Sequence, residues 1–167
     1  NQFTINSEVL NSWDPNDKLV LPRGVSSNRY ITSNDELEYV LNFQNTGQDT
    51  AFLIIIRDTI QSYLDITTLK YMVSSHDYVL KILDSNILEW TFNNINLVDS
   101  TTNEPASHGW VKFSINQIPN ITDGTVIKNS GGIYFDYNIP VQTNKATVTV
   151  NNAFFTSIDL PVIFGPS

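Results

Sequence analysis

The feature of this chain that most restricts its fold is a two-residue alternation of apolar and polar side chains. The segment 36–44 shows it clearly, with Leu37, Tyr39, Leu41 and Phe43 at alternate positions. Such alternation is typical of a half-buried β-strand, because successive side chains of a strand point to opposite faces. No segment of twelve or more residues shows the apolar period of an amphipathic helix. The sequence therefore predicts an all-β protein.

Similar strand-like segments recur along the chain, separated by turn residues. We expect further strands at 18–22, 51–57, 64–73, 78–83, 87–92, 109–115, 125–128, 132–135 and 145–150. Many short strands at such spacing predict an immunoglobulin-like antiparallel β-sandwich, here with extended N- and C-terminal arms. We expect a linker or the tail of a preceding module at 1–12, the sandwich domain at 13–153, and a linker or C-terminal extension at 154–167.

Composition excludes several classes of protein. The 167 residues are 41% hydrophobic and 16% charged, which favours a folded core over disorder. The net charge of -8 argues against nucleic-acid binding, because a polyanion would be repelled. There are no cysteines, so disulfides, thiolate zinc sites and cysteine nucleophiles are ruled out. No apolar run approaches the roughly 20 residues of a membrane-spanning helix, so no membrane insertion is expected.

Several short sequence motifs are more specific for a protein family than the strand periodicity is. They include SWDPNDK at 12–18, FQNTG at 43–47, RDT at 57–59, NEPASHG at 103–109 and IYFDYN at 133–138. This set resembles a conserved repeat-type domain of uncharacterised function, found near the C-terminus of large bacterial surface proteins exported by the type IX secretion system. The resemblance spans about 13–150. It implies an extracellular immunoglobulin-like module at the bacterial cell surface, whose partners include neighbouring domains of the same polypeptide.

A polar loop before the first expected strand is a candidate calcium site. Asp14, Asn16 and Asp17 place three oxygen-bearing side chains within four residues, and Ca²⁺ prefers six to eight oxygen ligands. Asp136 and Asn138 could complete the site from another loop. The alternative is that these side chains bond their own backbone, as Asp and Asn commonly do in turns. Apart from calcium, we expect no cofactor.

Lys18 suggests a covalent cross-link. Sandwich domains of surface adhesins can join a lysine of the first strand to an asparagine of the last, with a buried carboxylate promoting the condensation. Lys18, Asn144 and either Glu38 or Glu104 have the required order in this chain. The chemistry needs a neutral, desolvated amine, as a buried lysine would supply. The alternative is an exposed or salt-bridged lysine.

The sequence gives no indication of an enzyme. Ser107 and His108 lack the context of a nucleophile elbow, and no catalytic residues are expected. Trp90 and Trp110 are expected in the core, because large aromatic residues commonly fill sandwich cores.

Two kinds of function fit these observations. The leading hypothesis is an adhesin-like structural spacer or presentation module of a large secreted or cell-surface protein, with calcium as a candidate stabilising ion. The alternatives are a module that binds a surface glycan or protein, through a loop such as 99–108, and an accessory domain of a secreted hydrolase. A row of exposed aromatic rings would favour the binding module.

Overall fold

The computed structural model describes residues 14–157, apart from the side chain of Tyr71, and these residues form an all-β sandwich. The first sheet has four strands in the order β1-β3-β8-β5, all antiparallel to their neighbours. Its strands are β1 (Lys18–Leu21), β3 (Leu37–Gln44), β8 (His108–Gln117) and β5 (Leu64–Ser74).

The second sheet has five strands in the order β11-β10-β4-β7-β6, again antiparallel. These are β11 (Val141–Gln142), β10 (Gly131–Phe135), β4 (Ala51–Thr59), β7 (Ile87–Leu97) and β6 (Val79–Leu83).

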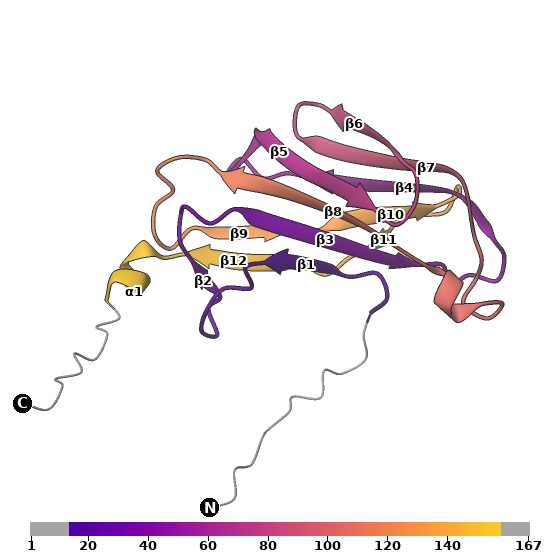
Figure 1. The fold of residues 1–167 in the computed structure, drawn as a ribbon, viewed down its shortest axis with the longest axis horizontal. Helices are drawn as coiled ribbons and strands as arrows, with labels where there is room; N and C mark the ends of the chain where they lie inside the picture. The colour runs from indigo at the N-terminus through magenta and orange to yellow at the C-terminus, as the bar shows by residue number, and fades with distance from the viewer. Residues whose placement is uncertain (1–13, 158–167) are drawn as a thin grey trace, which may run out of the picture.

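A third, smaller sheet completes the sandwich. It contains β2 (Tyr30–Ile31), β12 (Ala146–Val150) and β9 (Val126–Asn129) in that order. β12 pairs with β2 in parallel and with β9 antiparallel. β9 leads almost directly into β10, so the chain passes from the small sheet into the five-stranded one. Figure 1 shows the small sheet at the end of the molecule that also carries α1.

Two short helices lie outside the sheets: a 3-10 helix η1 (Glu104–Ala106) and α1 (Asn152–Thr156). α1 packs through Phe154, whose ring centre lies 5.0 Å from that of Tyr30. Within residues 14–157, no helix has the length and the apolar character needed to cross a bilayer.

The core lies between the two larger sheets and is rich in aromatic rings. Trp90 of β7 contacts Phe113 of β8 at 5.5 Å between ring centres, and Phe43 of β3 contacts Phe92 of β7 at the same separation. All four rings are buried. Because each pair joins one sheet to the other, these rings fix how the sheets face each other.

The predicted fold class is confirmed, and the ten expected strands are all present within a few residues of their expected bounds. Leu37, Tyr39, Leu41 and Phe43 are buried on one face, as their alternation indicates. The sequence did not reveal β2 and β11, because two-residue strands are too short to show a period. Residues 1–13 and 158–167 lie outside the described residues, so the arm at 1–12 and most of the arm at 154–167 stay predictions; the start of the second arm belongs to α1.

Candidate functional site

The most unusual feature of the interior is a cluster of three buried polar side chains, Lys18, Asp58 and Asn129. We call it the buried cluster. Nζ of Lys18 contacts Oδ2 of Asp58, and Nδ2 of Asn129 donates to Oδ1 of the same carboxylate at 2.7 Å. All three side chains are nearly inaccessible, with exposed fractions of 1%, 0% and 3% in that order. One carboxylate therefore holds an amine and an amide side by side, away from water.

Each member of the buried cluster comes from a different sheet. Lys18 begins β1 in the four-stranded sheet, Asp58 lies near the end of β4 in the five-stranded sheet, and Asn129 ends β9 in the small sheet. Strand alternation directs these residues inward: Lys18 shares a face with Val20, and Asn129 with Ile127. The cluster is thus a point at which all three sheets are bonded together.

The electrostatics of the buried cluster oppose a permanent charge on Lys18. Nζ lies 5.0 Å from the ring centre of Tyr39 and 5.3 Å from that of Phe113, so aromatic rings take the place of water. Burial lowers the pKa of Lys18, and the charge and hydrogen bond of Asp58 only partly oppose this. Burial, and then the charge of Asp58, raises the pKa of Tyr39. The neutral amine is therefore favoured more strongly than for a lysine in water.

Two polar atoms beside the cluster lack a protein partner. Among the residues that the structure describes, Oδ1 of Asn129 and the hydroxyl oxygen of Tyr39 are buried without a hydrogen bond. A buried polar atom without a partner typically costs about 1–3 kcal/mol. Such groups are rare in folded proteins and often mark a strained or reactive site. The carbonyl of Asn129 is therefore held in a costly environment, on a side chain that shares the Asp58 carboxylate with the Lys18 amine.

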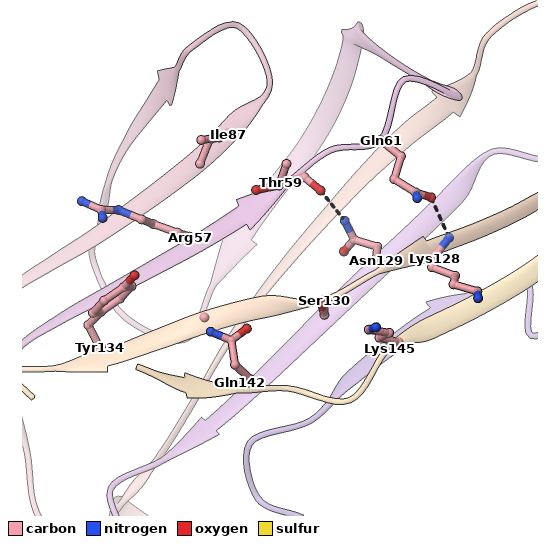
Figure 2. Close-up of a pocket in the computed structure, with 11 residues that line it drawn as sticks. Arg57, Thr59, Gln61, Ile87, Lys128, Asn129, Ser130, Tyr134, Gln142 and Lys145 are labelled. Atoms are coloured by element: carbon pink, nitrogen blue, oxygen red, sulfur yellow. Dashed lines mark hydrogen bonds between the residues drawn. The ribbon is translucent and has the colours of Figure 1, made fainter. Parts of the chain in front are cut away.

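An open pocket of about 500 Å³ borders the buried cluster on the side of Asn129. Figure 2 shows the Asn129 side chain directed toward Thr59, whose backbone oxygen accepts from Nδ2 at 3.3 Å. Arg57, Lys128 and Lys145 also line this pocket. The amide nitrogen of Asn129 thus lies between the closed interior and a polar opening toward solvent.

The residues predicted to cross-link with Lys18 are not hydrogen-bonded to its side-chain amine. Asn144 bonds the backbone of Lys18 on both sides, and its amide does not hydrogen-bond to Nζ. Glu38 forms an ion pair with Lys112 at 2.7 Å, and Glu104 contacts His108 at 2.8 Å. The structure instead places Asp58 at the lysine side chain and Asn129 on the other oxygen of the same carboxylate.

A sequence signal for Asp58 did exist. The expected strand ended at Arg57, but β4 continues to Thr59, so Asp58 follows Ile54 and Ile56 on the buried face. An acidic residue at an inward position of an apolar strand requires a buried partner. Asn129 carried no comparable signal, because an asparagine at a strand end is usually part of a turn.

The residues predicted to bind calcium are engaged in hydrogen bonds within the protein. Asp14 accepts from the amide of Asn16 at 3.0 Å, Asn16 accepts from the amide of Gln44 at 3.1 Å, and Asp17 accepts from the side chain of Asn42 at 2.7 Å. The bond of Asp14 lies within the loop, and the bonds of Asn16 and Asp17 tie the loop before β1 to β3.

The second part of the predicted calcium site lies after β10. Asp136 accepts from the amides of Phe52 and Leu53 at 3.0 and 2.8 Å, and the amide of Asn138 donates to Phe135 at 3.1 Å. Within 14–157, no three or more His, Asp or Glu side chains form a group suited to a metal ion. Calcium binding by Asp14, Asn16, Asp17, Asp136 and Asn138 stays a prediction.

Trp90 is buried as predicted, but the prediction for Trp110 was wrong. Trp110 is 37% exposed, because it lies on the outer face of β8 with His108, while Val111 and Phe113 point inward. Its ring lines a pocket of about 440 Å³ that also includes Gln44. The exposed ring provides a flat aromatic surface at the edge of this pocket.

A known family covers most of the chain. The sequence model of the family described as "Domain of unknown function (DUF7619)" matches residues 14–149. The chain belongs to this family. All three residues of the buried cluster lie within the DUF7619 match. No curated protein matches the chain at a significant level.

Several solved structures are similar in fold to this DUF7619 domain. BcpA, the major pilin subunit of Bacillus cereus, aligns with a TM-score of 0.59 and 12% identity over 81% of this chain and 39% of that chain. The major pilin SpaD from Corynebacterium diphtheriae aligns with a TM-score of 0.52 and 18% identity over 78% and 34% of the two chains. A collagen-binding domain from a Staphylococcus aureus adhesin aligns with a TM-score of 0.46 and 14% identity over 84% and 99%.

The two pilin alignments support the fold of the DUF7619 domain and not a particular activity. The pilin identities are low, and this chain spans only 39% and 34% of the two pilin chains. The shared property is an antiparallel β-sandwich.

Proposed function

We propose that this DUF7619 domain is an adhesin-like structural module, which spaces or presents other parts of a large secreted or cell-surface bacterial protein. The observation that carries the proposal is the buried cluster, which bonds one residue from each of the three sheets. Removing one member of a buried ion pair typically costs about 3–5 kcal/mol. A cluster of this kind resists separation of the sheets, and such resistance is what a spacer under tension needs.

The context of the proposal rests on two further observations. The fold is similar to that of parts of two major pilins, BcpA and SpaD. The sequence words at 12–18, 43–47 and 103–109 resemble a domain of proteins exported by type IX secretion. Both support an extracellular location, with neighbouring domains of the same polypeptide as the first partners.

Two experiments on the bacterium that encodes this chain test the proposal. Antibodies raised against the purified domain should label intact cells or the secreted fraction, and labelling that requires cell lysis would contradict the location. Replacement of 14–157 in the full-length protein by an unrelated sandwich of similar size should preserve the exposure of neighbouring domains. Loss of a binding activity after this exchange would contradict the spacer role.

A second candidate function is ligand binding, and one observation favours it. The exposed ring of Trp110 lines a pocket with Asn42, Gln44, Glu104 and His108, a mixture of ring and polar groups that suits a glycan or a peptide. A glycan array and a panel of extracellular matrix proteins would test this function. Trp110→Ala should abolish any binding found, whereas Phe52→Ala, which removes another exposed ring, should not.

An accessory role beside a secreted hydrolase is a property of the full-length protein. The domain exchange described above tests it as well, because an accessory domain would be needed for hydrolysis of the natural substrate. Unchanged hydrolysis after the exchange would exclude that role and support a spacer.

A further inference from the structure

We propose that Lys18 and Asn129 become joined by an intramolecular amide bond, with Asp58 as the group that moves the protons. The inference rests on the proposed structural function, because it explains how the buried cluster would hold the sheets together permanently. It starts from the arrangement of one carboxylate with an amine on Oδ2 and a carboxamide on Oδ1. The bond would make Lys18 and Asn129 a modification site in the centre of the sandwich.

The environment prepares the amine for attack. An ammonium ion has no electron pair to donate, so the lysine must first be neutral. Nζ of Lys18 is buried over the rings of Tyr39 and Phe113, and its one acidic neighbour in the cluster can accept its proton. Closure of the core also removes water, which would otherwise compete for the carboxamide.

The carboxamide is also held for the reaction. Nδ2 of Asn129 is bonded both to Asp58 and to the backbone oxygen of Thr59, which fixes the plane of the amide. The nitrogen that must leave therefore faces the carboxyl group that can protonate it. Its oxygen has no hydrogen-bond partner among the residues of 14–157, so no protein group blocks the oxygen side of the carboxamide by bonding to it.

The step balances without an oxidant or a further reactant. One proton of the Lys18 ammonium moves to Asp58, which leaves a neutral amine. The electron pair of Nζ forms a bond to Cγ of Asn129, the proton of Asp58 passes to Nδ2, and the Cγ–Nδ2 bond breaks with its electrons on nitrogen. The attacking nitrogen returns its second proton to Asp58. The products are an amide, a neutral Asp58 and one molecule of ammonia.

The surroundings suit these products better than the reactants. The reaction removes the buried ammonium and carboxylate charges together, and the new amide keeps an N–H that can donate to Asp58. Ammonia is released where Asn129 borders the polar pocket of Figure 2, which gives it a route to solvent. Once ammonia has left, the reverse reaction would need water inside the core.

The test is the intact mass of the purified full chain after denaturation. Loss of one ammonia lowers the mass by about 17 Da relative to the sequence. Because an asparagine that cyclises on its own backbone loses the same mass, a protease digest must also yield one branched peptide containing Lys18 and Asn129. Asp58→Asn and Lys18→Met should each show the full mass of their sequence. Asn138→Ala, which changes an exposed asparagine of the β10–β11 loop, should keep the loss.

Each outcome is decisive. A wild-type chain of full mass, with Lys18 in a linear peptide, overturns the bond whether or not any variant folds. A mass loss without the branched peptide also overturns it, and a bond that forms in Asp58→Asn overturns the role of Asp58. None of these results bears on the spacer function, which the cell labelling and the domain exchange test separately.

Discussion

The side chain of Asn144 brackets the backbone of Lys18: its Oδ1 accepts from the Lys18 amide at 2.7 Å, and its Nδ2 donates to the Lys18 carbonyl at 3.0 Å. The side-chain amide of Asn144 thereby supplies the two backbone hydrogen bonds that a neighbouring strand would make to β1. The start of β1 is fixed on one side by β3 and on the other by Asn144. This relationship holds Lys18 in position to reach into the core.

Asn144→Ala should therefore destabilise the domain. Two hydrogen bonds are lost, and at about 0.5–1.5 kcal/mol each the free energy of unfolding should fall by about 1–3 kcal/mol. Urea denaturation of the variant and the wild type measures the difference. Asn138→Ala, a change at an exposed asparagine of the β10–β11 loop, is the matched control and should have little effect. Equal stability of all three proteins would show that the bracket contributes nothing.

Gly109 lies opposite Phe43 in the β3–β8 pair, where a larger side chain has no room. A Cβ at position 109 would lie 2.2 Å from Cζ of the buried Phe43 ring. Gly109→Ala should lower the free energy of unfolding by about 1–3 kcal/mol, because the ring must move. In combination with Phe43→Leu, the added methyl group gains space, so the two changes should cost less together than their sum. Strictly additive effects would argue against a clash with the ring.

The loop 99–107 should lose stability in acid because of Asp99. Hydrogen bonds from Thr101, first its hydroxyl, and from Thr102 hold the pKa of Asp99 well below its ordinary value. A carboxylate whose pKa is depressed by folding stabilises the folded state above its unfolded pKa of about 3.9, and this stabilisation is lost as the pH falls further. Asp99→Asn should thus be less stable than the wild type at pH 7, by a difference that shrinks below about pH 4.

Thermal unfolding at a series of pH values measures this difference. Asp49→Asn, at an exposed aspartate in the turn between β3 and β4, is the control. The interpretation fails if the gap between Asp99→Asn and the wild type is the same at pH 7 and pH 3.

Mechanical unfolding should reveal the proposed bond between Lys18 and Asn129. When the chain is pulled from its two ends, the roughly 110 residues between these positions cannot extend if the bond is present. At about 3.3–3.6 Å per residue, the bond shortens the unfolded length by roughly 360–400 Å. Force spectroscopy of the wild type and Asp58→Asn compares the two lengths. The same extension for both proteins would mean that β1 and β9 are not joined.

Calcium stabilisation stays a prediction of the polar loop before β1, and melting in EDTA and then in millimolar Ca²⁺ tests it. An ion that binds only the folded state adds about 2.7 kcal/mol of stability at one hundred times its Kd. Asp17→Ala should remove the calcium-dependent rise and, through the lost bond to Asn42, also lower the melting temperature without calcium. Identical melting curves in EDTA and calcium would eliminate the ion and leave Asp17 a purely structural role.

The strand pattern was legible in the sequence because it is a local property. The pleat of a strand sends alternate side chains to opposite faces, so Leu37, Tyr39, Leu41 and Phe43 could be assigned to one buried face without knowing their neighbours. The same rule places Trp110 on the outer face, because it shares its side of β8 with the polar His108 and Lys112. The prediction that the Trp110 ring is buried was wrong because it relied on the residue type, whereas the alternation along β8 places this side chain on the outer face.

The composition of the buried cluster was decided only by the tertiary structure. Asp58 is 40 positions from Lys18 and 71 from Asn129, and no local rule relates them. Their meeting depends on which strands pair, on the register of each pair and on how three sheets close around one core. The sequence by itself determined that the chain forms strands and that Lys18 begins the first of them. Long-range packing chose its partners, because contacts between sheets are fixed by the whole fold and not by any one segment.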